Sequence, residues 1–342
     1  MPELVPMKRN TRAEIVHGLT QFHPHRWVRN QHLQTILGSY WLADVPRLVG
    51  KLHHVQCPDG DQLTLHEDKT TRKAPFKKIA FLAHGLGGSA DSGYMTRMSA
   101  CLGKRGWTVF RMNHRGCGKG AYLASKTYHS GKSDDISRVL QFIEQLHPDT
   151  PVISVGFSLS GNALLKMLGQ GADPIPSTLK GAIAVTPPIE LSLCAHELAK
   201  TSRWIYDQRF VRLLLQQIKQ RKSVFPDFPT MQFPVKLNLL AFDELCTAPL
   251  HGYASAADYY TKCSAKQFLA NINIPTLILA SKDDPFIPSE SFCNIPTNEN
   301  LACYLTEQGG HMGFLAQSPT PLGDWRWMDY VIVKAAENLL SL

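Results

Sequence analysis

The sequence predicts an α/β fold in which a mostly parallel central sheet is covered by helices. Short apolar runs recur along the chain, helical stretches lie between them, and polar or glycine-rich loops follow several of the runs. This alternation is typical of parallel strands connected through helices. Because the runs are short and mostly apolar, we expect strands that are covered on both faces. The expected strands are 79–83, 108–112, 152–156, 181–186, 276–280 and 302–306.

Segments with helical periodicity lie between most of these strands. The expected helices are 94–104, 133–146, 160–168 and 327–340. The alternation breaks at about 188–271, where a long helical, charged and aromatic region lies between two core strands. A connection of this length carries secondary structure of its own, so we interpret it as a helical lid inserted into a single domain, 1–342. The segment 1–50 has weak periodicity, and we expect an N-terminal extension there.

The composition is that of a folded protein without a nucleic-acid surface. Of the 342 residues, 44% are hydrophobic and 19% are charged, which excludes the low hydrophobicity and high charge of a disordered chain. The formal net charge is +8, but the basic residues are scattered and do not alternate with aromatic residues. We therefore expect no nucleic-acid partner. The eight cysteines are spread singly, which favours free thiols.

Targeting and membrane signals are weak. Residues 1–16 lack the apolar core of about 7–15 residues that a signal peptide needs, and no segment reaches the roughly 20 apolar residues of a membrane span. We expect a cytoplasmic protein, and the positive charge leaves peripheral membrane contact open. The sequence does not predict an oligomeric state.

A nucleophile is predicted at Ser158. Residues 151–168 contain an expected strand, then Gly156-Phe157-Ser158, then an expected amphipathic helix. A serine at a sharp turn from strand to helix projects its hydroxyl, and the N–H of the next residue, Leu159, faces the developing oxyanion. The usual elbow is Gly-x-Ser-x-Gly, whereas here Ser160 stands at the last position and Gly161 follows it. A Gly-x-Ser sequence alone also occurs in ordinary loops; the flanking strand and helix favour the elbow.

A second oxyanion donor is predicted at Leu86. Residues 81–88 form an expected strand that ends in His84-Gly85-Leu86 and two further glycines. In a fold of this kind, the turn after an early strand donates a backbone N–H to the substrate. A plain glycine turn is the alternative, and we interpret His84 as structural. A phosphate-binding loop is disfavoured because the Walker spacing is absent.

The acid and the base are predicted in the last two strand-end loops. Asp284 follows strand 276–280 and directly precedes a Pro-x-x-Pro turn, so we choose it over Asp283, which we expect to cap or contact the loop. His311 lies on a glycine-rich loop after the last expected strand. An acid orients the imidazole, and the order Ser, Asp, His is that of the α/β-hydrolase fold. Asp243, in the helical region, is a weaker candidate for the acid.

Several other segments resemble a known family. The chain is similar to the YheT-like group of α/β-hydrolases, bacterial relatives of eukaryotic ABHD-type lipases and esterases. The resemblance spans nearly the whole chain and rests on the triad loops and on segments 30–36, 58–60, 113–118, 128–131, 242–244 and 258–260. It implies a triad of Ser158, Asp284 and His311 that acts on carboxylic esters, with a place in lipid metabolism. Ser160 departs from the glycine that is usual in this group.

The function expected from the sequence is hydrolysis of short- to medium-chain acyl esters through an acyl-enzyme on Ser158. The partner is then a small-molecule acyl ester, and no metal or organic cofactor is needed. The histidines at 23, 25, 53 and 54 lack a recognised metal-ligand pattern. Two alternatives stay open: an acyltransferase that uses the same triad, and a non-catalytic binding protein with a hydrolase fold. Chemistry with a carboxylate nucleophile is disfavoured because the elbow residue is a serine.

Overall fold

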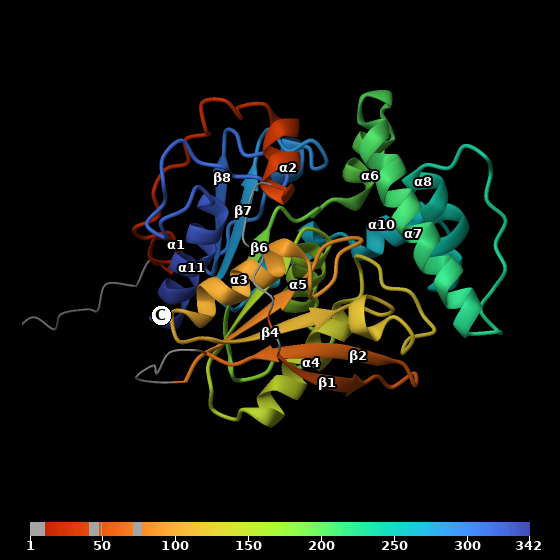
Figure 1. Cartoon of the computed structure of the whole chain (residues 1–342), viewed down its shortest axis with the longest axis horizontal. Coiled ribbons are helices and arrows are strands. Elements are labelled where there is room, and N and C mark those ends of the chain that lie inside the picture. Colours follow the sequence, from red (N-terminus) through yellow and green to blue (C-terminus); the bar gives the residue numbers. More distant parts are fainter. Residues whose placement is uncertain (1–10, 41–47, 49, 71–76) are drawn as a thin grey trace, which may run out of the picture.

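The computed structural model describes residues 11–40, 48, 50–70 and 77–342. Parts of the expected N-terminal extension, namely 1–10, 41–47 and 49, lie outside the described residues. Figure 1 shows a twisted central sheet with helices packed against it, and a group of helices at one end of the molecule. The predicted α/β fold is confirmed.

The sheet has eight strands in the order β1-β2-β4-β3-β5-β6-β7-β8. Strands β1 and β2 run antiparallel to their neighbours, and the pairs from β4 to β8 are parallel. The strands are β1 (Lys51–Gln56), β2 (Gln62–Asp68), β3 (Ile79–Ala83), β4 (Thr108–Asn113), β5 (Val152–Phe157), β6 (Leu179–Val185), β7 (Thr276–Ser281) and β8 (Leu301–Thr306). The carboxyl ends of the parallel strands therefore share one edge of the sheet, where a site is expected.

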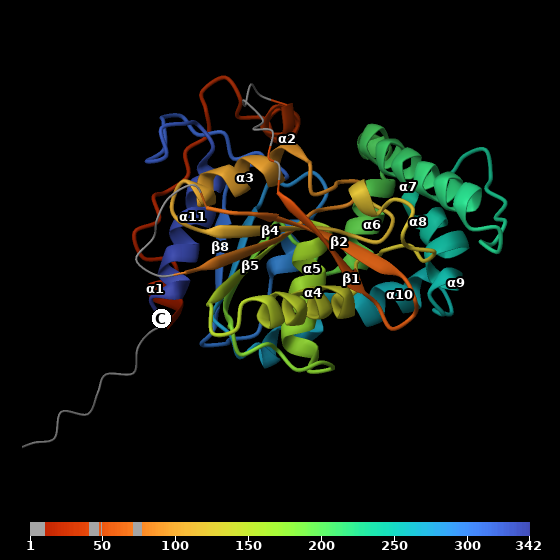
Figure 2. The same ribbon diagram turned by 60° about the horizontal axis from the view of Figure 1, so that its bottom comes forward.

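Helices cover both faces of the sheet because successive strand residues point to opposite faces. In β3, Ile79 and Phe81 pack in the core on the side of α4 and α5, whereas Ala80 and Leu82 pack on the side of α3 and α11. Figure 2 shows these two layers. The helices are α3 (Gly93–Gly103), α4 (Ser133–Leu146), α5 (Leu159–Gln170) and α11 (Trp327–Leu340). Short 3₁₀ turns lie at Gly118–Gly120, Thr201–Arg203, Ser289–Phe292 and Ala265–Asn271, the last of which is η4.

The six strands predicted from apolar runs are all present, with boundaries that differ by at most two residues. Strands β1 and β2 were not predicted, because their buried positions mix apolar and polar side chains. Both buried acids of β2 have partners: Glu67 hydrogen-bonds to His53, and Asp68 forms an ion pair with Arg111. A buried strand whose polar groups are paired gives no apolar run in the sequence.

The chain between β6 and β7 is helical, as the sequence predicts. This helical segment contains α6 (Leu191–Ala199), α7 (Trp204–Val224), α8 (Leu239–Phe242), a π-helix η3 (Asp243–Thr247), α9 (Ala248–Leu250), α10 (Ala256–Cys263) and η4. Its helices α6, α7, α8 and α10 gather at one end of the molecule in Figure 1. Leu214 and Ile218 of α7 join the core that α4 and α5 cover. None of the helices in the described ranges has the length and apolar character of a membrane span.

The described part of the N-terminal extension is packed onto the body. Helix α1 (Thr11–Ile15) lies against α11, and the amide of Asn338 donates to the Ile15 carbonyl at 3.0 Å. In α2 (Gln31–Tyr40), Gln34 exchanges two hydrogen bonds with the backbone of Leu315. His32 contacts Tyr206 of α7, with 2.9 Å between Nδ1 and the phenol oxygen. Helix α2 thus connects a loop after β8 to the helical segment.

A buried ion cluster fixes the loop after β4. Arg115 is only 1% exposed and binds Asp135 of α4 with two hydrogen bonds of 2.7 and 2.8 Å. Its Nη1 also donates to Asp61 at 2.6 Å and to Asp59 at 2.8 Å, both in the turn between β1 and β2. One guanidinium therefore joins three parts of the chain.

Removing this guanidinium is expected to destabilise the fold strongly. Arg115→Met leaves three carboxylates without their shared cation, and breaking a buried pair costs about 3–5 kcal/mol. We expect the free energy of unfolding, measured by urea denaturation, to fall by that amount. The matched control is Lys282→Met, which breaks an exposed ion pair with Glu307 and should cost less than about 1 kcal/mol. Equal losses in the two variants would contradict the structural role of the cluster.

Candidate active site

Ser158 lies at a sharp turn between β5 and α5. Its backbone has φ +50° and ψ −118°, a conformation that is strained for a residue with a Cβ. The turn is possible because strand and helix approach each other through glycines: a Cβ on Gly156 would lie 2.5 Å from the Ser160 carbonyl oxygen. A Cβ on Gly161 would lie 3.0 Å from Pro187. The local sequence therefore forms the predicted elbow.

His311 lies beside Ser158, on the loop after β8. Its Nε2 is 3.0 Å from the hydroxyl oxygen of Ser158. The loop reaches this position through Gly310, which has φ +60°. The backbone N–H of His311 donates to Thr35 of α2 at 2.9 Å, and the imidazole packs on the ring of Phe286. Both the loop and α2 thus orient this histidine.

Asp284 completes a chain of hydrogen bonds. Its Oδ2 is 2.7 Å from His311 Nδ1. Because an ionised carboxylate only accepts, the proton lies on Nδ1 and leaves Nε2 free to accept from Ser158. The other oxygen of Asp284 accepts from the N–H groups of Phe286 and Ile287, which fixes the carboxylate plane.

The two other acids considered from the sequence do not contact His311. Asp283 accepts a hydrogen bond from the Gly310 N–H at 2.9 Å, so it holds the loop that carries the histidine. Burial raises the pKa of Asp283. Asp243 lies in the π-helix and binds Thr247 and Tyr260. Ser158, Asp284 and His311 are therefore the three residues that the structure brings together.

Two backbone N–H groups near Ser158 are free to bind an anion. In the loop after β3, the N–H of Gly85 donates to Tyr94 and that of Gly87 to Tyr128. The N–H of Gly88 donates to the Gly85 carbonyl. Over the residues that the structure describes, the N–H groups of Leu86 and Leu159 have no acceptor. These are the two positions that the sequence suggests for an oxyanion hole.

Ser160, the departure from the usual elbow, connects the turn at Ser158 to this loop. Its hydroxyl donates to the carbonyl oxygen of His84 and lies 2.6 Å from His114 Nε2, from which it accepts. His84 Nδ1 donates to the Gly85 carbonyl, and His84 Nε2 accepts from the His114 N–H. Burial lowers the pKa of His84 to about 4 and holds the pKa of His114 well below its usual range, so both rings are neutral.

Sequence reasoning missed the partners of these loops. Thr35, Tyr94 and Tyr128 hold the histidine loop and the glycine loop, and His114 binds Ser160. Thr35 and Tyr128 belong to segments 30–36 and 128–131, which carry the family resemblance. The resemblance of these segments was therefore the sequence signal that could have identified both residues. No group of three or more metal-ligating side chains gathers in the described ranges.

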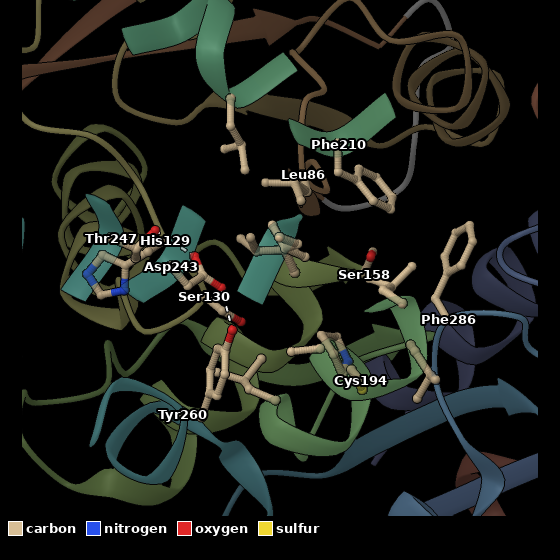
Figure 3. A pocket seen from close by; sticks show the side chains of 18 of the residues that line it. Leu86, His129, Ser130, Ser158, Cys194, Phe210, Asp243, Thr247, Tyr260 and Phe286 are labelled. Atoms are coloured by element: carbon tan, nitrogen blue, oxygen red, sulfur yellow. Dashed lines mark hydrogen bonds between the residues drawn. The ribbon is translucent and has the colours of Figure 1, made fainter. Parts of the chain in front are cut away.

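A largely apolar pocket opens from Ser158 toward the helical segment. Leu86, Phe210 and Leu214 line it, together with Phe286 and Ile287. Figure 3 shows Ser158 and Phe286 at one side of the pocket and a group of polar side chains at the other. The polar residues labelled there are Asp243, Thr247, Ser130, His129 and Tyr260. Ser158 therefore has an apolar surface beside it, which is large enough for hydrocarbon groups to pack against.

The comparisons with known proteins place the chain in a family. Residues 81–317 match a family model described as alpha/beta hydrolase fold. The chain is 33% identical to "Putative esterase YheT" of Escherichia coli (strain K12), with 86% of this chain and 87% of that protein covered. It is 27% identical to human "Phospholipase ABHD3", with 86% and 73% covered. A Danio rerio "Monoacylglycerol lipase ABHD2" is 27% identical, with 92% and 76% covered.

Solved structures show the same fold at low sequence identity. The Pyrococcus furiosus esterase Pf2001 superposes with a TM-score of 0.54 at 13% identity, covering 85% of this chain and 92% of that one. Est1E from Butyrivibrio proteoclasticus, with ferulic acid bound, gives 0.55 at 14% identity, covering 85% and 100%. The family model, the relatives and the sheet agree: the chain belongs to the α/β-hydrolase family and, within it, to the YheT-like group.

Proposed function

We propose that this α/β-hydrolase is a serine enzyme that cleaves carboxylic esters of short- to medium-chain acyl groups. The observation that carries the proposal is the chain of hydrogen bonds from Ser158 through His311 to Asp284 at the mouth of an apolar pocket. A serine hydroxyl is a weak nucleophile, and an adjacent base that is oriented by an acid activates it. The two free N–H groups beside the serine supply the oxyanion hole that such a site also needs.

In the acylation step, Ser158 Oγ attacks the ester carbonyl while His311 Nε2 accepts its proton. Asp284 holds the proton on Nδ1 and stabilises the imidazolium that forms. The carbonyl oxygen becomes an oxyanion, and the N–H groups of Leu86 and Leu159 donate to it. His311 then protonates the departing alcohol, which leaves an acyl-enzyme on Ser158. Water, activated by His311, releases the acid and restores the serine.

The pocket favours an acyl chain of limited length. Its wall near Ser158 is apolar, with Leu86, Phe210 and Phe286, so a hydrocarbon chain displaces water there at a gain of about 0.8 kcal/mol per buried CH₂. The apolar wall ends at buried polar groups around Asp243, which disfavour a longer chain. The names of the relatives, which include esterase, phospholipase and monoacylglycerol lipase, support ester substrates.

Acyl transfer to an alcohol is the second candidate. A yeast relative named "Medium-chain fatty acid ethyl ester synthase/esterase 2" is 26% identical over 263 residues, with 69% of this chain and 58% of that protein covered. An acyl-enzyme on Ser158 serves either reaction, since only the acceptor differs. Product analysis with and without added ethanol separates them, because transfer gives the ethyl ester whereas hydrolysis gives the free acid.

Labelling with a fluorophosphonate probe tests the proposed mechanism. We expect the purified protein to be modified at Ser158, with no labelling in Ser158→Ala and a sharp loss in His311→Ala. Asp284→Asn should lower kcat for a p-nitrophenyl ester by about 10⁴-fold, because the imidazole loses the tautomer that can accept the serine proton. Peptide mapping and initial rates are the measurements.

Two exposed residues of α6 provide matched controls for this experiment. Ser192 and His196 contact each other away from the pocket, so Ser192→Ala and His196→Ala should label as the unmodified protein does. Modification of a serine other than Ser158, or undiminished labelling of Ser158→Ala, would refute the proposal.

A separate prediction concerns Ser160 as a positioning residue. Ser160→Ala removes the hydroxyl that ties His84 and His114 to the elbow, so we expect the Leu86 N–H to shift. Loss of one oxyanion donor costs about 10²–10³-fold in kcat, and a displaced donor should cost roughly 10-fold or more. Affinity for a boronic acid inhibitor, which resembles the tetrahedral intermediate, should fall in parallel, with little change in KM.

Ser154→Ala is the matched control for Ser160→Ala. Ser154 is also buried, but it lies inside β5, and among the described residues its hydroxyl hydrogen-bonds only to the Gly181 carbonyl, at 3.5 Å. Both variants lose a buried hydroxyl, but Ser160→Ala also loses two short hydrogen bonds, so we expect it to lower the melting temperature more and to be the one of the two that lowers kcat. If kcat of Ser160→Ala stays within two-fold of the starting protein, the hydroxyl does not position the loop.

A further inference from the structure

The pocket contains a second group of polar side chains that the proposed ester chemistry does not use. Asp243 and Thr247 lie on the π-helix η3, and Tyr260 lies on α10. All three line the pocket that contains Ser158. In Figure 3 they stand across the pocket from the serine, with the dashed bond between Asp243 and Tyr260 visible. We call this group, together with Ser130, the polar end of the pocket.

Asp243 is a buried carboxylate without a cation. It is 8% exposed, and none of the ion pairs formed by the described residues includes it. The hydroxyl of Thr247 donates to Oδ1 at 2.6 Å and that of Tyr260 to Oδ2 at 2.7 Å. A carboxylate has about four lone-pair positions, so each oxygen can accept a further bond. Burial raises the pKa of Asp243 to about 6.

Ser130 supplies a donor at the same end of the pocket. Its hydroxyl oxygen accepts from Asn162 Nδ2 at 3.0 Å. Among the described residues no acceptor takes the Ser130 hydroxyl proton, and the residue lines the pocket. Its backbone is held by Tyr259 at 3.0 Å and by Asn162, so the position of the hydroxyl is fixed. The polar end thus offers one acceptor and one donor.

The backbone at Asp243 is also unusual. Asp243–Thr247 forms a π-helix between the short α-helices α8 and α9. Such turns are rare and are frequently found at functional sites. Here the π-turn carries both Asp243 and Thr247 on the wall of the pocket. A wide turn that exposes a buried carboxylate to a cavity is consistent with a binding role.

We propose that the polar end of the pocket binds a hydroxyl group of the ester substrate, which donates to Asp243 and accepts from Ser130. This inference rests on the proposed function. A hydroxyl matches both groups, because it is a donor and an acceptor at once. An ammonium group would leave the Ser130 proton unmatched, and a carboxylate would face Asp243 with like charge. The apolar wall between the two ends of the pocket requires a hydrocarbon spacer between the ester and the hydroxyl.

The hydroxyl can belong to the alcohol half of the ester or to its acyl chain, and two isosteric substrate series distinguish these sources. In the first, ω-hydroxyalkyl hexanoates with two to six alcohol carbons are each compared with the alkyl ester that ends in a methyl group instead. In the second, methyl esters of ω-hydroxy acids are compared in the same way. Each kcat/KM ratio is divided by the ratio of the rates at which hydroxide hydrolyses the same two esters, which removes the difference in their intrinsic reactivity.

For the unmodified protein we expect a hydroxyl preference of about 10- to 100-fold at one chain length in one series, because the hydroxyl bonds to a charged group. In Asp243→Asn the ratio should fall toward one, and in Ser130→Ala it should fall part of the way. The matched control is Asp207→Asn: Asp207 is another buried carboxylate of the helical segment, but it binds the Leu239 N–H and does not line the pocket. Its ratio should equal that of the unmodified protein.

The outcomes separate this inference from the proposed function. If Ser158 is labelled and plain esters are cleaved but neither series shows a hydroxyl preference, the polar end is structural and the inference is wrong. An unchanged ratio in Asp243→Asn also overturns it. If Ser158 is not labelled and no ester is cleaved, the proposed function fails and this inference fails with it. Should Asp243→Asn not fold, the ratios of the unmodified protein and of Ser130→Ala decide.

Discussion

The close approach of β5 and α5 at Ser158 is the constraint on which the rest of the site depends. Gly156 and Gly161 have no room for a side chain, and this lets Ser158 adopt a positive φ. The serine hydroxyl then lies above the carboxyl edge of the sheet, where the loops after β7 and β8 also begin. Because parallel strands bring these loops to one edge, an acid and a histidine far apart in the sequence can contact one serine.

Neutral, buried histidines support this arrangement. His84 and His114 are kept uncharged by burial, so they act as fixed hydrogen-bonding groups and not as proton carriers. Through them Ser160 connects the turn at Ser158 to the glycine loop. The replacement of the usual elbow glycine by a serine is therefore accommodated, because the close contacts fall on the glycines at 156 and 161 and the serine hydroxyl finds two polar partners.

The fold and the Ser158, Asp284 and His311 loops could be predicted because the signals are local: apolar runs, a strand-to-helix turn and strand-end polar residues. Strands β1 and β2 could not be predicted in this way. The charged side chains of β2 can be buried only because partners on other strands, such as Arg111 of β4, pair with them. The role of Ser160 was hidden for the same reason, because His114 lies 46 residues away. That Asp243 faces the pocket depends on how the helical segment packs, which no local pattern encodes.

Helix α2 contacts two parts of the protein that are far apart in the sequence, the loop after β8 and the helical segment. Thr35 accepts a hydrogen bond from the His311 N–H. The helix also packs so closely on the same loop that a Cβ added to Gly38 would lie 2.5 Å from the Gly313 Cα. On its other side, His32 contacts Tyr206 of the helical segment. One short helix therefore touches both the loop that carries His311 and the segment that shapes the pocket. A chimaera that grafts another relative's helical segment onto this sheet would need the matching α2 as well, so these two pieces are expected to be inherited and exchanged as a unit.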